Sequence, residues 1–188
     1  DVDGVRFIGI PWRGAATNAV LQRVVEDMPL LEWHNVHYTV LVTHVGIEGI
    51  IPDVPGCLKM SELAPLRQYV NYIATGHLHK PFEIDDWIHN PGAIENCDFQ
   101  EEQHRKDGKG VFVVDVAEDG SSVVEKHCIP GRPFHSVEFN VDTFSVPSEL
   151  SNGLQQQLKR EREHWDNLGK QPVIRVRLRG NLAFDRSL

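Results

Sequence analysis

Cysteine is scarce in this chain, and its three cysteines, Cys57, Cys97 and Cys128, have no C-x-x-C spacing. An odd number without that spacing argues against both a disulfide framework and a thiolate zinc site, and we expect a reducing cytoplasm. Long apolar runs are scarce as well. The longest, such as residues 40–42 and 111–114, fall far short of the roughly 20 residues needed to cross a bilayer, so we expect no membrane span.

An initiating methionine is also lacking, because the chain begins at Asp1 and no basic or apolar leader follows. We therefore expect no signal peptide and interpret the chain as a fragment. Its 188 residues, 40% hydrophobic and 24% charged, suffice for one sizeable core and part of a second. The net charge of -8 is uneven: residues 1–130 carry 10 Lys and Arg against 20 Asp and Glu, whereas residues 131–188 carry 9 against 7. Any nucleic acid must therefore be held by local features.

Strands and helices are predicted to alternate over the first half of the chain, which is the pattern of an α/β fold. Residues 5–10, 37–43 and 69–74 are predicted to be buried strands. Residues 19–26 have one apolar face and predict a helix, and Ser61 can cap a short helix through Gln68. The second and third strands each lead to histidines, at the edge where open α/β sheets place ligands.

Shorter runs follow from Phe82 onward and predict antiparallel strands at residues 82–84 and 87–89. Residues 110–116 and 122–129, joined by Glu-Asp-Gly, predict a hairpin. The Pro-Gly-Arg-Pro sequence at residues 130–133 indicates a boundary. Beyond it, a polar helix at about 148–168 and a strand at 173–178 are predicted to begin a second domain, which divides the chain into residues 1–133 and 134–188.

Three histidines follow the predicted strand ends: His44, and then His77 and His79 in the segment Gly76-His77-Leu78-His79. Side chains at i and i+2 of an extended segment point to the same side, and a preceding glycine lets the backbone approach a bound ion. In a two-metal site the ions lie only about 3.5 to 4 Å apart, so the two imidazoles can each serve one ion. An H-x-H pair alone is weak evidence, and a structural role is the alternative interpretation.

A run from Tyr72 to Pro81 contains these two histidines, and four further segments follow it along the chain. Together they resemble the calcineurin-like metallophosphoesterases and, within them, the SbcD-type DNA-repair nucleases. The segments are Asn90-Pro91-Gly92-Ala93-Ile94-Glu95, Phe99-Gln100-Glu101-Glu102, Lys109-Gly110-Val111-Phe112 and Arg132-Pro133-Phe134.

The resemblance implies a four-layer αββα sandwich, with its C-terminal half in residues 1–133 and the start of a small α+β capping domain in residues 134–188. It implies a DNA exonuclease in which His44 and His77 bind one divalent ion and His79 the other, normally manganese, with His77 and His79 at the catalytic centre. The metals would activate a water for in-line attack on a DNA phosphodiester. The implied partners are DNA, a second copy of the protein through a missing N-terminal region, and an SMC-like coiled-coil ATPase.

The remaining ligands of that family lie in D-x-H, G-D-x-x-D and G-N-H motifs, and none of these occurs before Val5. Without a bridging carboxylate two ions have nothing to share, so we expect the isolated chain to be inactive. Two other interpretations stay open: a phosphoesterase-like scaffold without catalytic activity, and a phosphoesterase that acts on small molecules.

Four arginines are candidates for DNA contact. Arg13 follows the first predicted strand and can reach a phosphate, although a solvated loop arginine is the alternative. Arg175, Arg177 and Arg179 alternate with apolar residues, which predicts a strand with one basic face. That face contacts the DNA backbone or is an ordinary solvent face.

Overall fold

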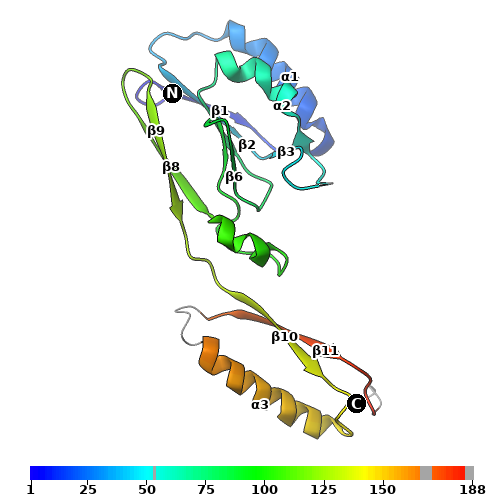
Figure 1. Ribbon diagram of the computed structural model, residues 1–188. Helices are drawn as coiled ribbons and strands as arrows, with labels where there is room; N and C mark the ends of the chain where they lie inside the picture. The colour runs from blue at the N-terminus through cyan, green and yellow to red at the C-terminus, as the bar shows by residue number, and fades with distance from the viewer. Residues whose placement is uncertain (53, 166–170, 185–188) are drawn as a thin grey trace. The chain divides into compact units, whose positions relative to one another are not determined.

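The structure is a computed structural model, and it describes residues 1–52, 54–165 and 171–184. The chain divides into two compact units, Asp1–Ile94 with Gln103–Pro130, and Glu95–Glu102 with Gly131–Leu188. The protein is of mixed α/β type, with one mixed sheet and several helices (Figure 1). None of the helices within the described residues combines the length and the apolar character that a membrane crossing requires.

A five-stranded sheet forms the centre of the first unit. Four of its strands run parallel, β1 (Val5–Ile10), β2 (Tyr38–Thr43), β5 (Tyr72–Thr75) and β7 (Ile88–Asn90). The short β6 (Phe82–Ile84) pairs antiparallel to β7 at the edge, which gives the order β1-β2-β5-β7-β6. A separate small pair, β3 (Gly46–Ile47) and β4 (Cys57–Leu58), follows β2 in the chain.

Helices cover one face of this sheet (Figure 1). They are α1 (Thr17–Asp27) and α2 (Met60–Leu63), each extended by a 3-10 segment, Met28–Leu30 and Ala64–Gln68. Leu21 of α1 and Leu63 of α2 are fully buried in the same apolar cluster as Leu41 of β2 and Ile73 of β5. Because side chains alternate along a strand, the neighbours of Leu41 and Ile73 face the other side of the sheet.

A hairpin of β8 (Gly110–Val116) and β9 (Ser122–Cys128) packs on part of that other side. The Tyr38 hydroxyl lies 3.0 Å from the Ser122 hydroxyl oxygen of β9. Beyond the hairpin the sheet face is open, since Phe7 of β1 is 58% exposed and Val42 of β2 is 46% exposed. The sheet therefore has one face covered by helices and one face covered only in part.

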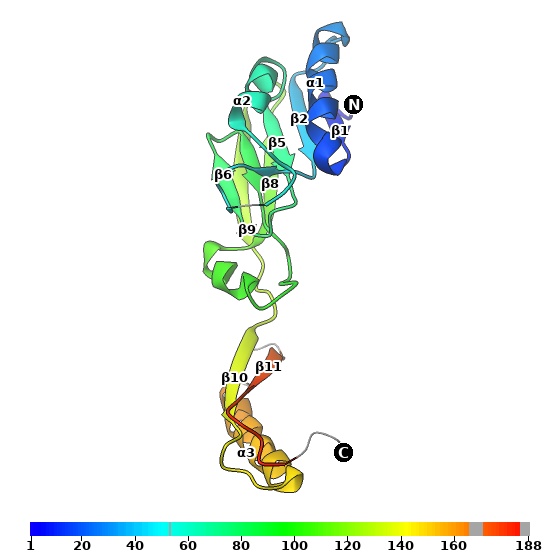
Figure 2. The same ribbon diagram turned by 90° about the vertical axis from the view of Figure 1, so that its right-hand side faces the viewer.

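The second unit is built on a βαβ arrangement (Figure 2). Strands β10 (Phe134–Asn140) and β11 (Val173–Arg179) pair in parallel, and α3 (Pro147–Trp165) lies between them in the chain. Val137 and Phe139 of β10 are buried together with Trp165 of α3. The apolar face of the strand pair is thus the face that α3 covers.

Most of the predicted elements are confirmed with small changes at their ends, among them the strand at 5–10, the helix of α1 and the hairpin. The predicted strand at 69–74 was wrong at its start, because the N–H groups of Tyr69 and Val70 both bond to the Leu66 carbonyl and close a helical turn. Ser61 is not the cap of α2: the helix begins at Met60, and the Glu62 carboxylate accepts a hydrogen bond from the Lys59 N–H.

Two further differences concern pairing. Strand β7 pairs antiparallel to β6 as predicted, but its other edge continues the parallel sheet through β5. Strand β10 was not predicted, although its alternation of buried Val137 and Phe139 with exposed neighbours has the period of a strand. The predicted end of the last helix at Leu168 lies outside the described residues, and α3 is described to Trp165.

Candidate metal site at the carboxyl ends of three strands

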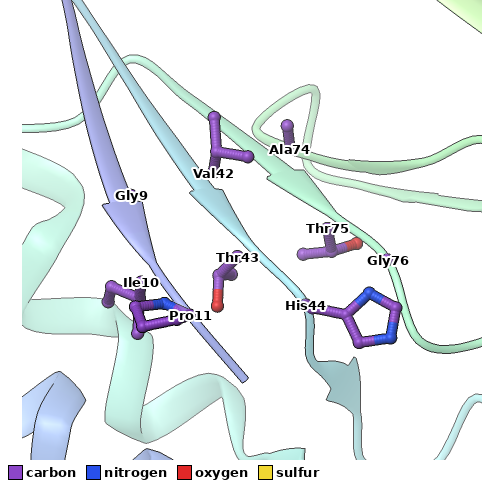
Figure 3. A pocket seen from close by; sticks show the side chains of 9 residues that line it. All are labelled: Gly9, Ile10, Pro11, Val42, Thr43, His44, Ala74, Thr75 and Gly76. Atoms are coloured by element: carbon purple, nitrogen blue, oxygen red, sulfur yellow. The ribbon is translucent and has the colours of Figure 1, made fainter. Parts of the chain in front are cut away.

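The carboxyl ends of β1, β2 and β5 lie in register at one edge of the sheet. Ile10 pairs with Thr43, and Thr43 pairs with Thr75, so the residues that follow them leave the sheet together. A pocket of about 530 Å³ opens there (Figure 3). Its lining comes from all three strand ends: Gly9, Ile10, Pro11, Val42, Thr43, His44, Ala74, Thr75 and Gly76.

His44 extends from the end of β2 toward Gly76 at the end of β5 (Figure 3). A Cβ atom on Gly76 would lie 2.9 Å from the His44 Nδ1, which is closer than side chains tolerate. The residue before His77 must therefore be glycine for the His44 ring to occupy this place. The centroids of the His44 and His77 rings lie 5.4 Å apart, with an interplanar angle of 71°. The two imidazoles are neighbours.

His77 stands at the centre of a tight three-residue turn. Its φ is 71°, and the Leu78 N–H donates to the Gly76 carbonyl at 2.9 Å, which closes a γ-turn. The other described non-glycine residues with positive φ are Asp3, Asn35, Asp85 and Asp86, all of types that tolerate this region. A histidine there costs about 1 to 3 kcal/mol of backbone strain, which tends to persist at functional sites.

This turn corrects the geometry that the H-x-H spacing predicted. The segment after β5 is not extended, so an i, i+2 alternation cannot describe how His77 and His79 are directed. The structure brings His44 and His77 together by the turn and by the bare Gly76. His79 follows beyond the turn, after the buried Leu78.

The ring of His77 is oriented by a backbone carbonyl. Its Nε2 lies 2.9 Å from the Pro55 oxygen, and because a carbonyl can only accept, Nε2 is the atom that carries the proton. In the neutral ring Nδ1 then has the lone pair. Metal-binding histidines commonly donate their second nitrogen to a carbonyl in this way, which fixes the tautomer and the ring plane.

Asn90 at the end of β7 holds the segment that carries His77 and His79. Its buried amide donates to the Leu78 carbonyl at 2.7 Å and to the Lys80 carbonyl at 3.2 Å. The Ala93 N–H donates to the His79 carbonyl at 3.3 Å. The sequence indicates a turn at Asn90-Pro91-Gly92 but not its role as a clamp, because only the fold brings β7 beside β5.

The remaining predicted site residue of this unit, Arg13, lies exposed in the loop after β1. Its backbone N–H donates to the Thr17 hydroxyl at 3.2 Å, and that hydroxyl donates to the Gly14 carbonyl at 2.8 Å. These two bonds fix the loop and leave the guanidinium at the surface. Burial and the charge of Glu48 raise the pKa of the nearby Cys57 thiol, which favours its neutral form.

The three arginines of β11 lie on one face of the strand pair in the second unit. Arg175, Arg177 and Arg179 are opposite Ser136, Glu138 and Asn140 of β10, while Ile174 and Val176 line a groove against α3. The Arg175 guanidinium stacks over Phe99 at 4.1 Å and donates to the Ser136 hydroxyl at 2.9 Å. Arg179 donates to Glu138 at 2.9 Å, and this bond and its charge, followed by that of Arg177, lower the pKa of Glu138. The predicted basic face therefore exists, and two of its arginines are held in fixed orientations.

No protein-family model matches this sequence, and no curated protein matches it. Any function proposed for this protein therefore rests on the residues of the site.

Proposed function

We propose that this chain supplies histidine ligands to the two-metal centre of a phosphodiesterase of the SbcD type, which hydrolyses DNA. The observation that carries the proposal is the His44–His77 pair at adjacent strand ends, with centroids 5.4 Å apart, beside a glycine that admits no side chain. The strained turn supports it, because a purely structural histidine does not need that cost in backbone strain. The Pro55 carbonyl supports it as well, because it fixes the plane of the His77 ring.

In this proposal His44 and His77 bind one divalent cation and His79 binds a second, with manganese as the expected metal. Neutral imidazole is a suitable donor for first-row divalent ions. When bound, the metals would lower the pKa of a water and stabilise charge on the phosphodiester. Arg13 and the basic face of β11 are proposed to hold the DNA backbone, which steers the substrate without reading its sequence.

The finer architecture is part of the same proposal. The helix-covered sheet and the β8–β9 hairpin would be portions of the two facing sheets of an αββα sandwich, and β10, α3 and β11 would begin the capping domain. The coiled-coil ATPase partner and the homodimer also belong to the proposal and rest on the resemblance alone. The cytoplasmic compartment belongs to it too and rests on the number and spacing of the cysteines.

A second candidate function is a non-catalytic scaffold, and one observation favours it. Among the described residues that line the pocket there is no carboxylate, so the charge of two cations is not offset there. Under the nuclease proposal those carboxylates come from D-x-H, G-D-x-x-D and G-N-H motifs elsewhere in the complete protein.

The test is a titration of the protein with Mn²⁺, followed by calorimetry or by the electron paramagnetic resonance of the free ion. His44→Ala and His77→Ala should each weaken Mn²⁺ binding by at least about tenfold, since each removes a ligand. His127→Ala, on the exposed surface of β9, is the matched control and should bind as the wild type does. Equal Mn²⁺ affinity in all four proteins overturns the proposal.

Nuclease activity is then compared between the 188-residue chain and a longer product that contains the carboxylate motifs. The expected result is Mn²⁺-dependent DNA cleavage by the longer product alone, and its loss in the longer His77→Ala protein. If the longer product folds and binds a partner but does not cleave, the scaffold function replaces the nuclease function.

A further inference from the structure

Trp12 is a large aromatic side chain left at the surface beside the histidine pair. It follows Pro11, which lines the pocket at the end of β1, and it is 55% exposed. The other three tryptophans differ in this respect. Trp33 stacks on Tyr69, and Trp87 and Trp165 are buried. An exposed indole beside the histidine pair is therefore a local feature of this loop.

Two glycines leave the space around the indole free of side chains. A Cβ on Gly14 would lie 3.7 Å from the six-membered ring of Trp12, and a Cβ on Gly56 would lie 3.6 Å from its Nε1. Both glycines have positive φ, 56° and 79°, a conformation that other residues rarely adopt. These two positions beside the indole therefore carry no side chain of their own.

Gly56 lies between Trp12 and His77. The position of a Gly56 Cβ lies 3.6 Å from the Trp12 Nε1 and 3.8 Å from the His77 Nε2. His77 in turn is the neighbour of His44. A ligand with an aromatic group on Trp12 would therefore have its adjoining atoms near the His77 side of the histidine pair.

The local charges help to identify the ligand. Arg13 lies next to Trp12, and the hollow that contains Gly14 and Gly56 is lined by Glu48 and Glu62 together with Lys59. Phosphates gain little net electrostatic energy where charges of both signs lie together, so charge alone does not favour a contact through phosphates only. A nucleobase has a π face, and stacking on an aromatic side chain does not depend on the net charge.

We propose that Trp12 is a stacking platform for an unpaired nucleobase of a single DNA strand whose adjacent phosphodiester lies at the His44–His77 pair. The inference deepens the proposed function and rests on it, because it names a single-stranded or frayed end, rather than continuous duplex, as the substrate form. A base within a duplex is stacked on its neighbours and cannot lie flat on an indole without leaving the helix.

The experiment measures oligonucleotide binding with chelator present and no metal, so that no cleavage occurs. A short thymidine oligonucleotide is titrated into the protein, and the tryptophan fluorescence is followed. An oligonucleotide of the same length with abasic sugars has the same phosphates and no bases, and it is the matched probe. We expect saturable quenching by the thymidine oligonucleotide and not by the abasic one.

The variants isolate Trp12 from the other tryptophans. Binding to the variants is measured by calorimetry, because they lack the Trp12 fluorescence. Trp12→Leu should weaken binding of the thymidine oligonucleotide by about 5- to 150-fold, the range for loss of one stacked base, and Trp12→Phe should keep most of it. Unfolding midpoints of both variants show whether the fold is intact. Binding of the abasic probe should be equally weak in all three proteins.

Two outcomes overturn the inference: equal quenching by the two probes, or unchanged thymidine binding in a folded Trp12→Leu protein. The probe comparison uses the wild type alone, so it decides the matter even where a variant fails to fold. Mn²⁺ titration separates this inference from the proposed function. Histidine-dependent Mn²⁺ binding without base-dependent quenching refutes only the stacking, whereas base-dependent quenching without Mn²⁺ binding refutes the two-metal centre.

Discussion

The imidazole of His89 lies flat against the ring of Tyr72, with centroids 4.4 Å apart and planes inclined by 4°. The edge of Phe112 from the β8–β9 hairpin meets the same imidazole at 5.1 Å, so His89 sits between the sheet and the hairpin. Its Nδ1 is buried and has no hydrogen-bond partner among the described residues. Burial lowers the pKa of His89, against smaller opposing effects of Glu83 and Asp86. The neutral form is therefore the one that the fold accommodates.

The first prediction follows from this lowered pKa. The unfolded chain binds a proton at His89 near the reference pKa of about 6.5, and the folded chain does so only at lower pH. The free energy of unfolding should therefore be fully maintained above that value and decrease as the pH falls below it. Urea unfolding of metal-free protein at pH about 7.5 and about 5.5 measures the effect.

His89→Leu removes the titrating group and should reduce the pH dependence of the unfolding free energy. His127→Ala, which changes an exposed histidine on β9, should leave that dependence close to that of the wild type. An identical pH dependence in His89→Leu and the wild type would contradict the prediction.

The second prediction concerns Gly76. In Gly76→Ala the new Cβ would lie 2.9 Å from the His44 Nδ1, so the ring must move although no ligand is removed. We expect Mn²⁺ affinity to fall about tenfold, the scale of a change beside a metal ligand. Gly9→Ala is the matched control at the end of β1, because a Cβ there meets nothing within 4 Å. Equal Mn²⁺ affinities in the two variants would show that a side chain at position 76 does not displace the His44 ring from a binding position.

The third prediction concerns the strain at His77. Glycine adopts positive φ without a steric penalty, so His77→Gly should be more stable than His77→Ala by about 1 kcal/mol, after the greater entropy of glycine in the unfolded chain is subtracted. The measurement is the difference in unfolding free energy between the two variants, neither of which retains the imidazole. A more stable alanine variant would mean that the turn is not strained.

The fourth prediction concerns the basic face of β11. If Arg175, Arg177 and Arg179 bind phosphates, changing all three to Gln should weaken binding to unrelated DNA sequences alike. The slope of log K against log salt should become shallower by about 0.7 to 0.9 for each phosphate that the protein no longer neutralises. Arg23→Gln on α1, where Arg23 pairs with Asp27, is the control for a simple change in net charge. An unchanged slope in the triple variant would make this an ordinary solvent face.

The positions of the helices and strands were predicted better from the sequence than the pairing of the strands. The periods of residues 5–10, 110–116 and 173–178 identify strands because burial of alternating or continuous apolar residues is a local property. The sequence also predicted that His44 and His77 follow strands at one edge of the sheet. The parallel pairing of β7 with β5 was not predicted, because pairing depends on contacts between distant segments.

The details of the site depend on backbone conformations that cannot be predicted from the residue types. A γ-turn with positive φ at its centre is rare for any residue other than glycine, so no propensity argument finds the turn at His77. Trp12 was not predicted as a site residue, although a tryptophan between Pro11 and Arg13 is a signal that an exposed aromatic lies near a strand end. Its relation to His77 arises from Gly56, which lies far from Trp12 in the sequence.

The hydrogen bonds of Asn90 to the segment after His77 also imply an order in which the turn at His77 is stabilised. The strands that lead to His44 and His77 are complete at Thr75, yet the amide that holds Leu78 and Lys80 belongs to β7. A nascent chain that has reached only Lys80 thus contains all three histidines without the anchor for the turn that carries two of them. The turn gains that anchor only after the chain reverses through β6 and β7, so the β6–β7 hairpin holds in place histidines that are synthesised before it.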